Sequence, residues 1–438
     1  MKRFLPSVGL SILGIIFFVN NAFAIPTFAR KYRTSCNTCH VAVPKLTAFG
    51  ESYRLNGYQI PEGDAAYVKE EPVSMGAPAW KKVWPDAVWP GEIPGPVPLS
   101  VRILSDFKVN EAAKTASTEF DFPHEVEVMM AGLLGENVPF FAEIEFEGGE
   151  TSTEAWLGFY DLLNNTLPQR SLNLKIGNLS WNPLAMANEH LRIGKNHYLY
   201  GDWKMPSSDN TFRLRDSRPG LELNGIVASR LYYSAGLLQG DDSHDKDPFF
   251  TLRYKWGGTA FDKSAPGDTG TEEAITGKSS GFWVDDALEL ALFGYFGETR
   301  ITENANDEFQ RLGVGLRKTY NNMDLSTGFI WGTNDDPYGI KSTQSIDSQS
   351  FFMEANYVFF PWLIGELRFE RLDVEWPSDY ITKTGGTVLS DIDQSRWVPG
   401  LIFQIRPNIK LVAEGLIYDN YGAGDKPDNF AVRLDVSY

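Results

Sequence analysis

The sequence predicts an all-β protein, an antiparallel transmembrane β-barrel of about sixteen strands preceded by a small α-helical module. Three observations support this fold class: an export signal at the N-terminus, repeated stretches of alternating polarity from Leu99 onward, and a last stretch that ends on the aromatic Tyr438. The chain has 438 residues, of which 42% are hydrophobic and 22% charged, so it is neither disordered nor a mini-protein. Its net charge of −17 argues against nucleic acid as a partner.

Residues 1–24 have the pattern of a signal peptide. Lys2 and Arg3 supply the positive start, residues 8–19 form an apolar stretch too short to span a bilayer, and Ala22-Phe23-Ala24 is a cleavage site of the small-x-small type. We therefore expect export through the Sec route, and a bacterial outer membrane as the destination of a barrel. A retained membrane anchor is the less favoured interpretation.

The segment Cys36-Asn37-Thr38-Cys39-His40 is a CxxCH motif, the attachment signature of c-type haem. Both thiols add to the porphyrin, and the adjacent imidazole becomes the proximal iron ligand, so the sequence predicts one covalent haem c on Cys36, Cys39 and His40. A thioredoxin-like pair would sit in a βαβ unit, and a zinc site would need more Cys or His; neither pattern surrounds the motif. We expect residues 25–62 to form a monohaem cytochrome module.

A helix is expected after Pro44, where apolar residues recur at helical spacing, and Gly57 would end it. The second axial ligand stays open among several residues. Met75 is the nearest methionine after the motif, while His124 and Met129 lie on a predicted strand and could point inward. An open sixth position is the remaining alternative.

Residues 63–98 form a linker rich in proline and tryptophan, which excludes regular helix and central strand. Its tryptophans Trp80, Trp84 and Trp89 are expected to pack against the module or the next domain.

Residues 99–438 are predicted to form the porin-like barrel, because apolar and polar residues alternate with the period of a strand. In one stretch Ile144 and Phe146 alternate with Glu143, Glu145 and Glu147, so these three carboxylates should line the lumen. Tryptophans at strand ends are expected at the membrane interfaces; they are Trp181, Trp256, Trp331, Trp362 and Trp397. A soluble β-sandwich is the alternative that alternation alone leaves open.

The predicted strands are 99–108, 124–134, 138–147, 153–163, 172–179, 221–227, 230–239, 249–256, 287–296, 308–319, 322–332, 350–359, 362–374, 395–404, 408–418 and 429–438. Short turns should alternate with long outer loops at 180–220, 297–307, 332–349 and 375–394. The connection 257–286 breaks this rule, so either a periplasmic loop is long or strands are misplaced.

The N-terminal segment resembles the fused outer-membrane monohaem cytochrome–porin family. The likeness rests on Phe28-Ala29-Arg30, the CNTCH motif, Pro44, Leu46, Phe49-Gly50 and Gly57-Tyr58. It implies a c-haem at Cys36, Cys39 and His40 joined to a barrel of about sixteen strands, and for some members the oxidation of external ferrous iron. Glu51 departs from the iron-oxidiser version, which has arginine there, so the resemblance supports the architecture better than it supports iron as the substrate.

The function expected from this combination is an electron conduit across the outer membrane. Its partners would be a periplasmic cytochrome or another electron carrier, outer-membrane lipid, and an extracellular donor such as a metal ion. In this interpretation the module lies inside the barrel and puts iron near the outer surface. The alternative is a diffusion porin with a structural or sensory haem. A peroxidase would need an open sixth position, and no acid/base or nucleophile pattern elsewhere predicts an enzyme. The lumen carboxylates are expected to be a solvated pore wall rather than a metal site.

Overall fold

The computed structural model describes residues 27–438 apart from a set of gaps. The gaps are 62, 70–72, 75–78, 80–81, 84, 86–91, 94–98, 111–116, 136, 182–183, 185–190, 241–244, 265–284, 341–343, 378–391 and 422–427. The predicted signal peptide, Met75 and the three linker tryptophans lie outside the described residues. Among the described residues, no helix is both long enough and apolar enough to cross a bilayer.

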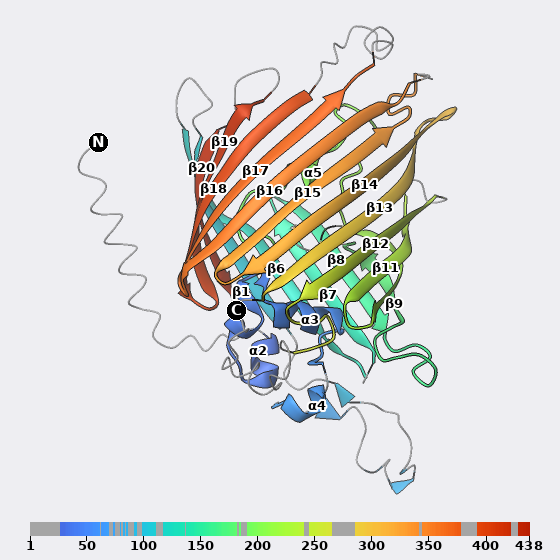
Figure 1. Ribbon diagram of the computed structural model, residues 1–438, viewed down its shortest axis with the longest axis vertical. Helices are drawn as coiled ribbons and strands as arrows, with labels where there is room; N and C mark the ends of the chain where they lie inside the picture. The colour runs from blue at the N-terminus through green and yellow to red at the C-terminus, as the bar shows by residue number, and fades with distance from the viewer. Residues whose placement is uncertain are drawn as a thin grey trace, which may run out of the picture.

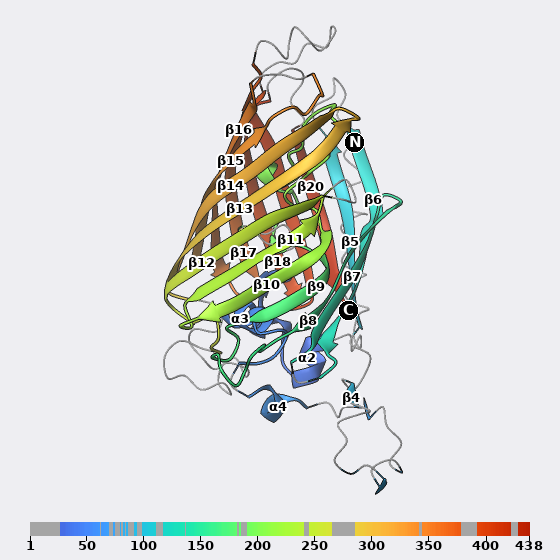
Figure 2. The ribbon, with the colours of Figure 1, turned by 90° about the vertical axis from the view of Figure 1, so that its right-hand side faces the viewer.

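Sixteen antiparallel strands close into one barrel (Figures 1 and 2). They are β5 (Leu99–Asn110), β6 (Ser117–Leu133), β7 (Pro139–Glu147), β8 (Glu150–Phe159), β9 (Asn173–Leu179), β10 (Arg218–Val227), β11 (Leu231–Gln239), β12 (Lys246–Gly257), β13 (Ala287–Thr302), β14 (Ala305–Tyr320), β15 (Met323–Asn334), β16 (Ile346–Phe360), β17 (Leu363–Glu375), β18 (Ile392–Arg406), β19 (Ile409–Asn420) and β20 (Asn429–Ser437). Each strand pairs with the next in the chain, and β20 pairs with β5 to close the cylinder.

Every predicted strand overlaps one strand of the barrel, so the predicted fold class is confirmed. The long connection after β12 is genuine, because β12 pairs directly with β13. The expected outer loop 297–307 is wrong. β13 and β14 stay paired as far as Thr302 and Ala305, so this connection is a tight hairpin.

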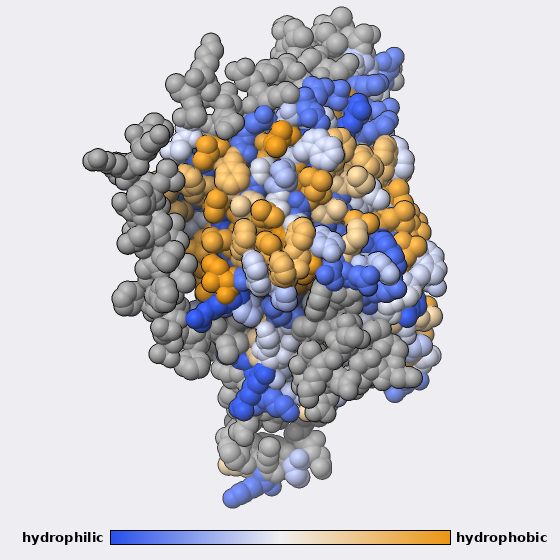
Figure 3. Space-filling model, turned by 60° about the vertical axis from the view of Figure 1, so that its left-hand side comes forward, coloured by the Kyte–Doolittle hydropathy of each residue, from blue (hydrophilic) through white to orange (hydrophobic). Residues whose placement is uncertain are grey.

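An apolar belt covers the outside of the barrel. Figure 3 shows hydrophobic residues gathered over the barrel wall, with hydrophilic residues toward the upper rim. The predicted alternation holds on this surface, since Ile144 and Phe146 face outward while Glu143 is buried. Trp256, Trp331, Trp362 and Trp397 are also exposed on the outside, which suits an interfacial position.

Trp181 was wrongly predicted to belong to this interface. It is only 2% exposed and packs inside the barrel against Phe249, Phe293 and Tyr295. The reason is that the chain after β9 turns into the lumen instead of staying at the rim.

The N-terminal segment fills the barrel mouth at the end with the short turns (Figure 1). Its elements are α2 (Thr27–Tyr32), the 3-10 helix η1 (Cys36–Thr38), β1 (His40–Ala42), β2 (Lys45–Leu46), α3 (Ala48–Leu55) and α4 (Asp64–Tyr67), with a separate two-stranded pair of β3 (Val73–Ser74) and β4 (Glu92–Ile93). The helix expected after Pro44 is α3. The expectation that the module lies near the outer surface is wrong, because α3 contacts barrel residues at the short-turn end, which is the periplasmic end of a porin-type barrel.

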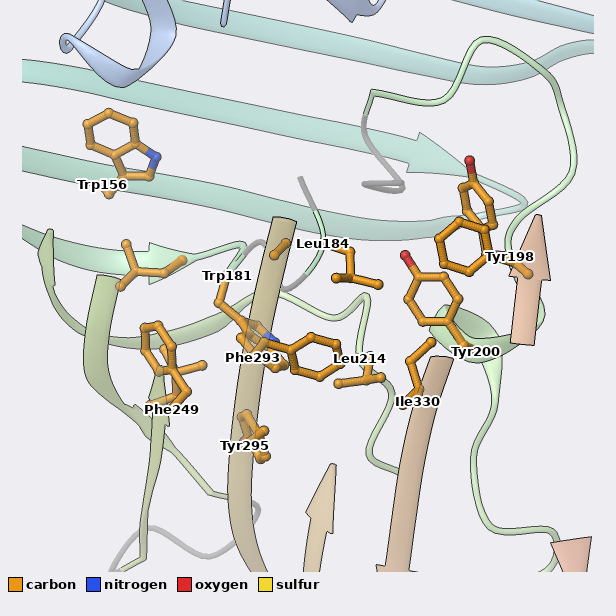
Figure 4. Packing of buried hydrophobic residues seen from close by; sticks show 14 of the residues in the cluster. Trp156, Trp181, Leu184, Tyr198, Tyr200, Leu214, Phe249, Phe293, Tyr295 and Ile330 are labelled. Carbon is orange, nitrogen blue, oxygen red and sulfur yellow. The ribbon is translucent and has the colours of Figure 1, made fainter. Parts of the chain in front are cut away.

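The outer connection between β9 and β10, residues 180–217, is here called the inward loop. Its described residues enter the lumen from the opposite end. It includes the short helix α5 (Leu199–Asp202). Backbone N–H groups of Lys195 and Asn196 donate to Glu414 on the barrel wall, at 2.6 and 2.8 Å. Trp181, Phe293, Tyr295 and Tyr200 lie among the buried side chains of the lumen (Figure 4). Buried side chains of this connection and of the wall therefore occupy part of the lumen.

Candidate functional site in the barrel mouth

A single helical turn brings the two cysteines of the CxxCH motif together. Ser35 caps η1, its hydroxyl accepting from the Asn37 N–H at 3.3 Å, and the Cys39 N–H donates to the Cys36 carbonyl at 3.1 Å. Neither thiol is in a disulfide. The turn presents both sulfur atoms and the following imidazole to one cavity.

The ring of His40 is oriented by a backbone carbonyl. Its Nδ1 lies 3.0 Å from the carbonyl oxygen of Pro44. A carbonyl only accepts, so Nδ1 carries the hydrogen and Nε2 is left as the basic nitrogen. A metal-ligating histidine characteristically donates its other N–H to such an outer partner. Pro44 was expected to precede a helix, and its position four residues after His40 did not by itself predict this hydrogen bond.

Helix α3 holds the motif from the side. Thr47 caps this helix by accepting from the Gly50 N–H at 3.1 Å, and it also donates its hydroxyl to the Thr38 carbonyl at 2.9 Å. The Thr47 N–H donates to the Cys39 carbonyl at 2.9 Å. A Cβ on Gly50 would lie 2.0 Å from that same carbonyl oxygen. Glycine is therefore required here so that the helix can approach the motif.

Burial shifts the acid–base behaviour of the motif. It raises the pKa of Cys39 to about 12 and also raises that of Cys36. Burial also lowers the pKa of His40 to about 4. The positive charges of Arg102 and Lys410 lower this pKa further, whereas the hydrogen bond to Pro44 acts to raise it. The imidazole is thus neutral at physiological pH, which is the form that binds iron.

A cavity of about 870 Å³ opens beside Cys36, Cys39 and His40. This volume lies in the range of small-molecule and cofactor sites. Aromatic side chains of the module, among them Phe28, Tyr53 and Tyr58, line one part of the cavity, and barrel strands and the inward loop line the rest. The thiols, the oriented imidazole and the adjoining space are the donor set and the room that a covalent haem needs.

Buried ion pairs attach the module to the barrel wall. Lys45 lies 3.1 Å from Asp324 on β15, and Glu51 on α3 pairs with Arg253 on β12. Asn56 donates to the carbonyl of Phe261 at 2.8 Å. These contacts attach the module to β12, to β15 and to the connection after β12, so it is held at several points rather than tethered by its linker alone.

The candidates for the second axial ligand separate in the structure. Met129 on β6 lines the cavity that His40 faces. The ring nitrogens of His124 instead lie 2.7 Å from a carboxylate oxygen of Asp121 and 3.1 Å from one of Glu147. His124 does not line this cavity. Met75 lies outside the described residues.

His197 also lines the cavity, although no motif in the sequence distinguishes it from the other histidines. It comes from the inward loop, and the Arg215 guanidinium lies 3.0 Å from its Nε2. Only the fold of that loop brings His197 to the motif, which it follows by more than 150 residues.

The cavity wall is strongly charged. Glu143, Glu145 and Glu147 line it from β7, as predicted for lumen residues. Basic side chains face the same space from other elements, including Arg192 and Arg215 of the inward loop.

No protein-family model matches the chain, and a comparison with curated proteins also gave no match. Solved structures do share its fold. Salmonella typhi OmpF in complex with daunomycin matches with a TM-score of 0.52 at 11% identity, over 78% of this chain and 97% of that one. The anion-selective porin from Comamonas acidovorans matches with a TM-score of 0.51 at 8% identity, over 78% and 98%. The outer-membrane channel DcaP of Acinetobacter baumannii gives 0.50 at 12% identity, over 78% and 96%.

These likenesses, at such low identity, concern the fold. A closed barrel has no unpaired edge, and its apolar belt needs lipid, so this architecture is stable in a bilayer. The chain folds as a porin-like sixteen-stranded barrel of the bacterial outer membrane.

Proposed function

We propose that the protein is an outer-membrane c-type cytochrome joined to a porin-like barrel, which passes electrons between an extracellular donor or acceptor and a periplasmic carrier. One observation carries the proposal. The CxxCH motif presents two thiols and an imidazole to one large cavity, and Pro44 already orients the ring of His40 as an iron ligand requires.

Each residue of the motif has a definite task in this proposal. Cys36 and Cys39 would hold haem c through two thioether bonds, and His40 would bind its iron through Nε2. When bound, the haem supplies reversible one-electron redox chemistry. Pro44 fixes the imidazole tautomer, and α3 keeps the motif in place through Thr47 and Gly50.

The position of the motif favours exchange with a periplasmic carrier, because the module fills the short-turn mouth. Beside the module, the lumen contains closely packed aromatic rings. Tyr58 stacks on Trp156 with ring centroids 5.9 Å apart, and Phe28 stacks on Tyr58 at 5.1 Å. These rings belong to the hydrophobic cluster that also includes Trp181 and Phe309. A lumen filled in this way suits electron transfer better than free diffusion of solutes.

Purified protein from the outer-membrane fraction tests the proposal. A pyridine haemochrome assay should report one c-type haem per chain, and replacing both Cys36 and Cys39 by alanine should abolish it. Stopped-flow spectra should show the haem changing redox state with a periplasmic cytochrome or with ferrous iron. A haem that responds to neither would overturn the conduit.

The second candidate is a diffusion porin whose haem is structural or sensory, and the porin-like fold favours it. Liposome swelling separates the two functions. Haem-loaded protein that admits small sugars freely would be a porin, whereas protein that excludes them supports the conduit.

In either case we propose an electron-transfer or transport role and no enzymatic one. A peroxidase would require a vacant sixth position on the iron. A low-spin ferric spectrum that ignores peroxide and cyanide would rule the peroxidase out, and a prompt response to peroxide would favour it.

A further inference from the structure

Three carboxylates of the cavity wall converge on one point. Glu125 and Glu127 on β6 and Glu145 on β7 each place one carboxylate oxygen within 4.8 Å of the others. Strand pairing causes this closeness, since Glu127 lies directly opposite Glu145 in the β6–β7 register. Neighbours directly opposite on one face of a sheet are in side-chain contact, and like charges there are destabilising.

Arg102 is shared between two carboxylates of the barrel wall. It pairs with Glu127 at 2.8 Å and with Asp435 at 2.7 Å. Its single positive charge is therefore divided, and Glu127 does not have it alone. Glu145 accepts a hydrogen bond from the neutral hydroxyl of Ser152.

Glu143 provides an independent observation. It lies two residues before Glu145 on the same face of β7, lines the same cavity, and is only 8% exposed. Among the residues that the structure describes, it has neither a hydrogen-bond nor an ion-pair partner. A carboxylate that is buried without a partner is costly, so its presence here points to a ligand that supplies positive charge.

We propose that Glu125, Glu127, Glu143 and Glu145 form a binding site for a hard divalent cation inside the cavity that Cys36, Cys39 and His40 face. Carboxylate oxygens are the ligands that Mg²⁺, Ca²⁺, Mn²⁺ and ferrous iron accept, and no sulfur or imidazole is needed. The inference stands on the geometry of the barrel wall and does not depend on the proposed function. If that function holds, the site would keep a cationic electron donor next to the motif.

Mn²⁺ alone is a suitable probe, added to the purified full-length protein in detergent at neutral pH. The loss of the free-Mn²⁺ resonance signal on titration should reveal one saturable site. The E125Q/E145Q double variant should bind Mn²⁺ at least about tenfold more weakly, the scale on which even outer-shell groups affect metal affinity. E119Q is the matched control, because Glu119 lies on β6, is exposed and does not line the cavity; its affinity should equal that of the natural chain.

Thermal unfolding gives a second readout that a merely structural role would not produce. Mn²⁺ should raise the melting temperature of the natural protein by mass action and leave E125Q/E145Q unaffected. Without metal, the double variant should be as stable as the natural protein or more so, because the substitutions remove like-charge repulsion. Equal Mn²⁺ affinity in all three proteins, or weak binding that never saturates, would overturn the site.

The C36A/C39A variant separates this inference from the haem proposal. It should retain the Mn²⁺ site although it cannot attach haem covalently. Loss of Mn²⁺ binding in that variant, with the barrel still closed on a heat-modifiability gel, would show that the carboxylates alone do not make the site.

Discussion

The ion-pair cluster between α3 and the barrel wall leads to an asymmetric mutational prediction. It contains three acidic side chains, Glu51, Asp285 and Glu289, and two basic ones, Arg253 and Lys255, all at most 11% exposed. The substitution E51Q leaves two acids facing two bases. The substitution R253Q leaves three acids around one lysine, which is an uncompensated buried charge.

The two substitutions should therefore differ in cost. E51Q removes a hydrogen bond between charged groups, which is worth about 1.5–3 kcal/mol. R253Q removes the basic partner of two buried ion pairs, with Glu51 and with Glu289. It should destabilise the docked module by about 3–5 kcal/mol. A change of about 1.4 kcal/mol alters the equilibrium constant for local opening tenfold. The opened fraction of the module should therefore rise roughly ten- to a hundredfold in E51Q and more than a hundredfold in R253Q.

Hydrogen exchange of peptides covering Ala48–Leu55 measures this opening directly. A heat-modifiability gel checks that the barrel itself stays closed, and E375Q, at the exposed end of β17, is the control. Equal exchange in E51Q and R253Q would refute the reasoning, because it would mean that apolar packing rather than the charge balance holds α3 in place.

Three further predictions concern the same mouth. Burial opposes the ionisation of Glu51, but Arg253 and Lys255 hold its pKa at about 2, below the ordinary 4.5. The contribution of Glu51 to docking should therefore be complete above pH 4.5 and lost as the pH falls toward 2. Hydrogen exchange of the α3 peptides across that pH range measures this. The substitution G50A should cost about 1–3 kcal/mol of local stability through overpacking against Cys39 and lower the haem-stained fraction of the protein, whereas G135A, where a Cβ meets nothing closer than 3.9 Å, should leave it unchanged. The substitution M129L should open the ferric haem to added imidazole and M130L, whose side chain faces lipid, should not; identical spectra in both variants would exclude Met129 as the second axial ligand.

The barrel was accessible to sequence reasoning because its signal is local and repeated. Alternation along β7 or β12 states directly which side chain faces lipid, and sixteen such stretches fix the strand order when each pairs with its neighbour. The hairpin at Thr302 was missed because polar residues there suggest a loop, although long strands can extend beyond the membrane while remaining paired.

The interior was less accessible, because its contacts join residues far apart in the chain. Trp181 has the sequence surroundings of an interfacial tryptophan, and only the inward course of the following loop buries it. Lys45 meets Glu354 across 309 positions, and no local pattern announces such a pair. The motif itself was found because covalent haem attachment demands neighbouring residues, whereas the cavity around it is assembled by tertiary structure.

The seam of the cylinder has a consequence for how the protein is assembled. α2 touches the first strand where the Thr27 N–H donates to Ser100, and the same strand receives the last one beside it. On the opposite side of the mouth, Lys45 forms an ion pair with a residue of β15 and Glu51 forms one with a residue of β12. Since the N-terminal segment is held on both sides of the ring, we expect it to fold into place before the first and last strands pair, rather than to enter a barrel that has already closed.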